Sequence, residues 1–162
     1  MKKLKGLVVM FVALLMMGST IWAASPTDGF WEYEVYSSDG SKVDSGIINP
    51  FLRATWEGVT VGSGQTAVFK PAGSSGLIVT SGVELTIKCT LSRSASAKVA
   101  LGTPSGNVTL KNGTFSSITH YYTTGSKGYY TGRVTNNSSS SFTCLLYTSK
   151  LLVHNYGWYR RP

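Results

Sequence analysis

The sequence predicts an all-β chain folded as an antiparallel, jelly-roll-like β-sandwich, and three observations carry this expectation. Apolar and polar residues alternate with a period of two along most of the chain beyond about residue 30, which is the pattern of half-buried strands. Apolar residues do not recur there at the helical spacing. Glycine-rich turns separate the alternating runs at short intervals, as is typical of sandwiches.

An N-terminal signal peptide is expected over residues 1–23. Basic residues at its start are followed by an apolar run and then by small residues up to Ala23. The apolar run is too short to span a bilayer comfortably, and no cysteine for lipid attachment follows it. We therefore expect cleavage after Ala23 and a secreted, extracellular protein with no membrane span in its mature form.

The alternating runs define the expected strands in chain order. The clearest covers residues 83–92, where Leu85, Ile87, Cys89 and Leu91 share the apolar phase. The others are expected at 31–35, 43–48, 52–61, 66–70, 77–80, 98–101, 107–111, 114–118, 119–124 and 127–135.

A first hairpin is expected at Asn112-Gly113. This dipeptide favours a two-residue turn because both positions tolerate positive φ. It would join the strand at 107–111 to the strand at 114–118.

A second hairpin is expected to join 119–124 to 127–135 and to place Tyr122 opposite Tyr129. The two rings would then point outward together. Exposed aromatic rings on a sheet are suited to stacking on sugar rings, so this pair is the candidate glycan-stacking site. The alternative is an ordinary cross-strand aromatic pair that only stabilises the sheet.

Residues 144–149, Cys-Leu-Leu-Tyr-Thr-Ser, resemble a translated DNA element. The codons TGT-CTC-TTA-TAC-ACA-TCT, similar to the transposase end used in sequencing libraries, encode all six residues in one frame. On this interpretation residues 24–143 form the sandwich domain and residues 144–162 are a foreign tail. The alternative is a genuine final strand at 142–147 followed by a polar tail.

Whether the two cysteines are expected to pair depends on whether residues 144–162 are native. In an exported protein with a native tail, Cys89 and Cys144 would be expected to form a disulfide. With a foreign tail, Cys89 is alone in the apolar phase of its strand and is expected to be a buried free thiol.

The chain carries a formal net charge of +8. Most of this excess lies in the signal peptide and the tail, because residues 24–143 hold nine basic side chains against seven acidic ones. The nine are scattered singly and form no basic stripe, so no nucleic-acid partner is expected.

Residues suited to catalysis or metal binding are few. Without the tail, His120 is the only histidine, and no nucleophile-elbow motif accompanies it. Glu32 and Glu34 share one face of one strand, which favours a solvated surface over a paired-carboxylate site. Asp39 and Asp44 flank a turn without the dense acidic pattern of a calcium loop. We expect no enzymatic activity, metal or cofactor.

The run at 128–139, Gly-Tyr-Tyr-Thr-Gly-Arg-Val-Thr-Asn-Asn-Ser-Ser, resembles the last hairpin of many exported bacterial β-sandwiches, and the runs at 81–86 and 91–95 are similar to the same group. The chain thus resembles small exported β-sandwich proteins of Gram-positive bacteria and, distantly, pre-peptidase C-terminal domains. The resemblance implies the fold class and carries over no catalytic residues.

Together these observations favour a secreted, non-catalytic binding or cell-envelope-associated protein whose partner is an extracellular glycan or a cell-wall polymer. One alternative is a structural or adhesive surface component that uses an exposed sheet edge. Further alternatives are a small secreted hydrolase that depends on His120 and a bacteriocin-like toxin.

Overall fold

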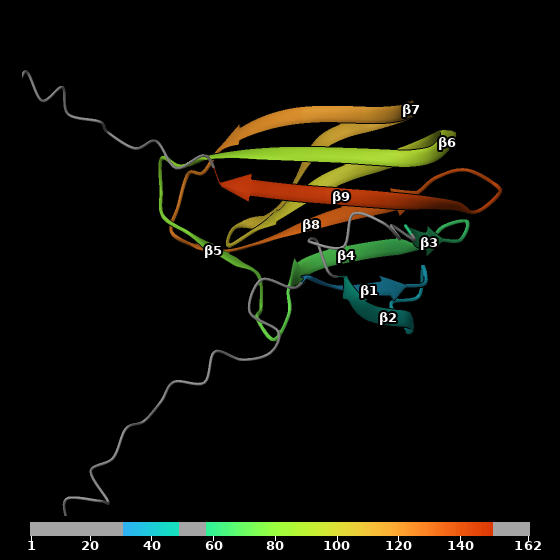
Figure 1. The fold of residues 1–162 in the computed structure, drawn as a ribbon, viewed down its shortest axis with the longest axis horizontal. Helices are drawn as coiled ribbons and strands as arrows, with labels where there is room; N and C mark the ends of the chain where they lie inside the picture. Colours follow the sequence, from blue (N-terminus) through green and yellow to red (C-terminus); the bar gives the residue numbers. More distant parts are fainter. Residues whose placement is uncertain (1–30, 49–57, 151–162) are drawn as a thin grey trace, which may run out of the picture.

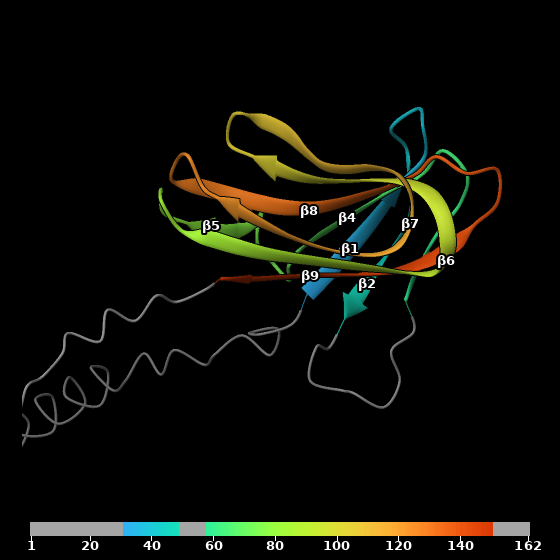
Figure 2. The same ribbon diagram turned by 90° about the horizontal axis from the view of Figure 1, so that it is seen from above.

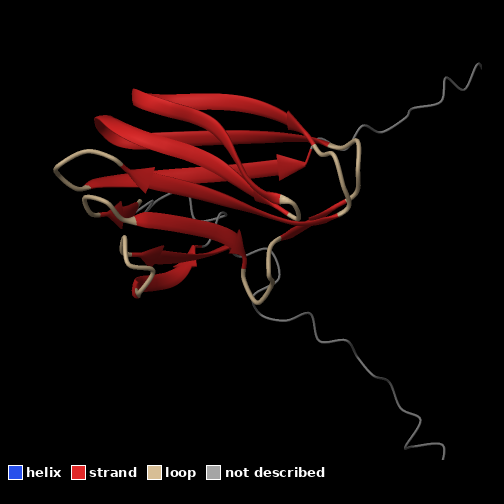
Figure 3. Ribbon diagram, turned by 180° about the vertical axis from the view of Figure 1, so that it is seen from behind, coloured by secondary structure: helices blue, strands red, loops and turns tan. Residues whose placement is uncertain are grey.

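The structure is a computed structural model that describes residues 31–48 and 58–150. Every regular element in these ranges is a strand (Figures 1 and 3). The strands are β1 (Trp31–Tyr36), β2 (Lys42–Ile48), β3 (Val59–Val61), β4 (Thr66–Pro71), β5 (Leu77–Val79), β6 (Glu84–Thr103), β7 (Gly106–Thr123), β8 (Gly128–Asn136) and β9 (Phe142–Lys150). All their pairings are antiparallel. The prediction of an all-β antiparallel sandwich is confirmed.

The strands follow the order β2-β1-β4-β8-β6-β9-β3, with β5 beside β8 and β7 beside β6. This sheet curls into two layers, because the long β6–β7 pair bends from one layer to the other (Figure 2). Residues 97–102 of β6 pair with β8, whereas residues 85–91 pair with β9. The first layer therefore holds β2, β1, β4, β5, β8 and residues 97–102 of β6. The second holds β9, β3, residues 85–91 of β6 and the part of β7 that pairs with them.

The core lies between the layers and is filled by alternate residues of the strands. Its largest fully buried side chains include Tyr130 and Phe69 from the first layer and Leu85 and Ile87 from the second. The predicted apolar phase of 83–92 is thus confirmed. Trp31 packs against this core, as its alternation predicts.

The hairpin predicted at Asn112-Gly113 is wrong. Both residues lie inside β7 and pair with β6, and the turn between these strands lies where Thr103 faces Gly106. Gly113 keeps a positive φ of 130° within the strand. Because β6 offers a partner along nearly its whole length, the continuous ladder satisfies more backbone groups than a hairpin folded at residue 112.

The hairpin predicted between 119–124 and 127–135 is also wrong. β7 pairs with β6, whereas β8 pairs with β4, β5 and β6, so the chain crosses between layers at residues 124–127. Thr124 is buried and anchors this crossing. Its hydroxyl donates to the Thr80 carbonyl at 2.6 Å and accepts the Val83 amide at 2.9 Å.

β9 lies between β6 and β3 in the second layer. Phe142, Cys144 and Leu146 are buried, and Leu146 packs closely against Gly132 of the opposite layer. Residues 142–150 thus occupy the place of a closing strand. The foreign origin of residues 144–162 and the domain boundary at residue 143 stay predictions.

Several predicted segments lie outside the described residues. These are the signal peptide at 1–23, the greater part of the strand at 52–61 and the end of the tail at 151–162. In the described ranges, no helix has the length and apolar character needed to cross a membrane.

Candidate functional site

The outward-pointing side chains of the first layer form a polar face. These side chains point outward because successive side chains on a strand alternate between the two faces, and the residues before and after them point into the core. Glu34, Val68, Arg133 and Ala100 lie opposite one another across β1, β4, β8 and β6. We call this surface the outer face.

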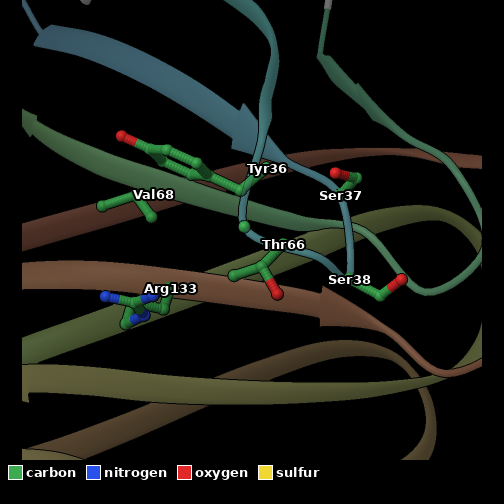
Figure 4. A pocket seen from close by; sticks show the side chains of 7 residues that line it. Tyr36, Ser37, Ser38, Thr66, Val68 and Arg133 are labelled. Atoms are coloured by element: carbon green, nitrogen blue, oxygen red, sulfur yellow. The ribbon is translucent and has the colours of Figure 1, made fainter.

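A groove of about 330 Å³ crosses the outer face (Figure 4). Its lining residues are Tyr36, Ser37, Ser38, Gly40, Thr66, Val68 and Arg133. Val68 lies between the Tyr36 ring and the Arg133 side chain (Figure 4). Although it points away from the core, Val68 is only 7% exposed. The Val68 side chain therefore forms an apolar floor of the groove, between an aromatic and a cationic side chain.

The turn between β1 and β2 forms one end of the groove and is held by Asp39. The Asp39 carboxylate accepts hydrogen bonds from the Ser37 hydroxyl and from the amide and hydroxyl of Ser41. These bonds hold the pKa of Asp39 at about 2. Gly40 supplies the positive φ of 86° that the turn requires. Asp39, which the sequence predicts to flank a turn, thus positions the groove residue Ser37.

Tyr36 is held through its hydroxyl by a cluster of charged side chains. Its hydroxyl donates to Glu34 Oε2 at 2.8 Å. The other Glu34 oxygen lies 3.4 Å from Lys42 Nζ, and Lys70 Nζ lies 3.5 Å from Glu34 and 3.1 Å from Glu32. The hydrogen bond from Tyr36, helped by the two lysines, lowers the pKa of Glu34. Glu32 and Glu34 are therefore paired with lysine rather than merely solvated.

Arg133 and two threonines complete the groove chemistry. The Thr66 and Thr135 hydroxyls lie 2.9 Å apart. Arg133 is half-buried, and among the residues that the structure describes its guanidinium forms no ion pair or hydrogen bond. The groove thus offers an aromatic face, several hydroxyls and one unpaired cation to a ligand.

Tyr129 extends the outer face towards the start of β8. Its side chain points to the same side of β8 as that of Arg133 and is 51% exposed. Tyr129 lies opposite Ile78, which is 59% exposed. It precedes Arg133 by four residues, a distance of about 13 Å along the strand.

The structure does not bring the predicted pair Tyr122 and Tyr129 together. Tyr122 lies opposite Leu85 and packs, half-buried, against the core. The exposed aromatic of that strand is its neighbour Tyr121, at 62%. The difference arises from the partner strand, because β7, which carries Tyr122, pairs with β6 and not with β8.

The other predicted residues have structural partners or no site around them. Asp44 accepts a hydrogen bond from the Tyr33 hydroxyl at 3.3 Å. His120 is half-buried opposite Ile87 in the second layer. Within the described ranges, no three side chains among His, Cys, Asp and Glu gather closely enough to hold a metal ion.

Both cysteines are free thiols in the core. Cys144 of β9 lies opposite Leu91 of β6, two residues from Cys89. Burial raises the pKa of Cys89 to about 12 and that of Cys144 well above its ordinary value. The disulfide expected for a native tail is not formed in this structure.

Sequence reasoning missed the groove, although one signal was available. Tyr36 occupies the polar phase of β1, the phase of Glu32 and Glu34, and an aromatic residue in that phase must point away from the core. The contributions of Thr66 and Arg133 depend on long-range pairing and had no local signal.

No family model matches the chain, and no curated protein matches it in sequence. Two solved structures have a similar chain course. One is the Clostridium thermocellum xylanase 10B, CBM22-1 and GH10 modules complexed with xylohexaose, with a TM-score of 0.43 and 12% identity over 76% of this chain. The chain spans only 26% of that protein. The other is the N-terminal cellulose-binding domain of Cellulomonas fimi β-1,4-glucanase C, with a TM-score of 0.37 and 17% identity over 73% of this chain and 85% of that one.

Proposed function

We propose that this chain is an exported, non-catalytic glycan-binding domain whose ligand lies along the outer face, between the groove and Tyr129. The observation that carries the proposal is the groove itself. It places the ring of Tyr36 beside the hydroxyls of Ser37, Ser38 and Thr66 over a covered apolar floor.

Sugars suit this arrangement because each ring has an apolar C–H face and a rim of hydroxyls. An aromatic side chain stacks on the first, and serine and threonine exchange hydrogen bonds with the second. The Tyr36 ring is also pre-positioned, since Glu34 holds its hydroxyl. A fixed aromatic loses little conformational entropy when a ligand binds.

Tyr129 indicates how long the ligand is. This second aromatic side chain is exposed and lies about 13 Å from Arg133 along the strand, which favours an oligosaccharide of several units over a single sugar. The proposal thus keeps one residue of the sequence-predicted stacking pair. It replaces Tyr122 by Tyr36 as the second aromatic.

The test is binding of the purified protein to a panel of soluble polysaccharides by affinity electrophoresis and calorimetry. Tyr36→Ala and Tyr129→Ala are each expected to weaken binding by about tenfold, because each removes a stacking face. Tyr121→Ala is the control, since it removes an exposed tyrosine, 62% against 51% for Tyr129, from the second layer. Tyr122→Ala tests the stacking pair Tyr122 and Tyr129 that the sequence predicts, and its folded fraction is expected to retain the wild-type affinity for the polysaccharide. Failure to bind any polysaccharide, or full affinity in Tyr36→Ala, would overturn the proposal.

The absence of catalysis is part of the proposal and has its own test. The bound glycan should release no reducing ends during prolonged incubation. Release that disappears in His120→Ala would instead support the hydrolase alternative.

A second candidate function is adhesion through a sheet edge. β2 pairs with β1 and with no other described strand, and its Val43 and Ile47 are 49% and 61% exposed. An open edge with apolar side chains can add a strand from another chain. Self-association in sedimentation that Val43→Lys abolishes would favour this function.

A further inference from the structure

The charge in the groove narrows the class of glycan. Arg133 is the only charged side chain among the described residues that line the groove. It is half-buried beside Val68. No described side chain supplies a counter-charge to its guanidinium, so a ligand in the groove can supply one.

The acidic side chains of the outer face are already engaged. Glu34 is bound by Tyr36, Lys42 and Lys70, and Glu32 by Lys70. Two strand spacings, about 10 Å, separate the backbone of Glu34 from that of Arg133. None of these carboxylates therefore neutralises Arg133.

A second cation lies on the same face. Lys98 of β6 is half-buried and lies opposite Thr135, whereas Arg133 lies opposite Ala100. This diagonal placement puts the two backbone positions roughly 7–8 Å apart. Arg133 and Lys98 thus form a cationic strip on the outer face, and Arg133 shares the groove with Tyr36.

We propose that the groove takes an acidic glycan and that Arg133 binds its oxyanion, either the carboxylate of a uronic acid or the phosphate of a wall polymer. The planar guanidinium fits both groups because it donates two parallel hydrogen bonds. Lys98 adds a second positive charge, and Ser37 and Thr66 are left for the sugar hydroxyls. This inference rests on the proposed glycan-binding function and specifies its ligand class.

The experiment compares matched polymers on the full-length protein. Polygalacturonate, its fully methyl-esterified form, a poly(glycerol phosphate) and neutral soluble xylan are titrated at about 50 mM and about 500 mM salt. The wild type is expected to bind an anionic polymer about tenfold more tightly than the neutral ones at low salt and to lose this preference at high salt. A stronger response to polygalacturonate identifies a carboxylate ligand, and a stronger response to poly(glycerol phosphate) identifies a phosphate ligand.

Two variants locate the effect. Arg133→Gln is expected to lose the anionic preference, so that its affinity for polygalacturonate no longer exceeds its affinity for the methyl-esterified form or for neutral xylan. Lys88→Gln is the matched control, because it removes one charge from an exposed residue of β6 in the second layer. It should keep the preference, which excludes a simple net-charge effect.

The outcomes separate the two proposals. Equal affinity of the wild type for polygalacturonate and its ester, together with no preference for poly(glycerol phosphate), overturns the acidic-ligand inference even where Arg133→Gln does not fold. Tyr36-dependent binding to neutral glycans would then leave the proposed function standing. Binding to none of the polymers would overturn both.

Discussion

Asn136 provides the sharpest test of how the two layers are joined. This side chain is fully buried at the end of β8. Its Nδ2 donates to the carbonyls of Val61 and Ser140 at 2.9 and 3.0 Å, and its Oδ1 accepts the Ser138 amide at 2.8 Å and the Ser138 hydroxyl at 2.6 Å. One amide therefore ties β8 of the first layer to β3 of the second and shapes the turn that leads into β9. Asn136→Ala removes all four hydrogen bonds.

The expected cost follows from the exposure of the partners. Val61 is fully buried, so its carbonyl loses a donor that water cannot replace, at about 1–3 kcal/mol. Ser138 and Ser140 are more exposed and reach water, so the net loss there is about 0.5–1 kcal/mol for each of the three bonds. The sum is about 4 kcal/mol of unfolding free energy.

Urea unfolding followed by tryptophan fluorescence measures this cost. At an m-value of about 2 kcal/mol/M, the midpoint of Asn136→Ala should fall by about 2 M. Asn137→Ala is the control, because Asn137 is exposed and its side chain donates one hydrogen bond to Asn112 at 3.2 Å. A midpoint for Asn136→Ala equal to that of the control would refute the assignment of Asn136 as the link between layers.

Three further outcomes are expected. Cys89 and Cys144 should not react with a thiol reagent in the native protein at pH 8 and should both react in denaturant, because burial raises their pKa values and shields them; rapid native labelling would contradict their placement in the core. The lowered pKa of Glu34 means that its contribution to stability is present above its ordinary pKa of 4.5 and is lost as the pH falls through the folded-state value; Glu34→Gln should therefore lose less stability on acidification than the wild type, and parallel pH profiles of the unfolding midpoint would contradict this. Tyr122→Ala should lower the thermal midpoint more than Tyr121→Ala, since only Tyr122 packs against the core; equal midpoints by circular dichroism would argue against that packing.

The local alternation of the sequence was enough to predict which residues of a strand enter the core. The apolar phase of 83–92 and the inward direction of Trp31 follow from a period of two, because successive side chains on a strand point to opposite faces. The turn at Ser37–Ser41 is local too, since Asp39 bonds to residues within two positions of itself. Such features need no knowledge of distant partners.

Strand partners were beyond that reasoning. Asn112-Gly113 has strong hairpin chemistry, yet a long neighbouring β6 gave its backbone a better partner than a local turn. For the same reason the predicted neighbours Tyr122 and Tyr129 lie in different strand pairs. Which strand pairs with which is decided by burial across the whole chain.

The sequence by itself determined the fold class, the inward phase of the strands and the polar phase that carries Tyr36, because these depend only on neighbours along the chain. The tertiary structure alone decided that Tyr36, Thr66 and Arg133 line one groove. These residues come from β1, β4 and β8, which are separate in sequence and lie side by side because β4 pairs with both β1 and β8 in the first layer.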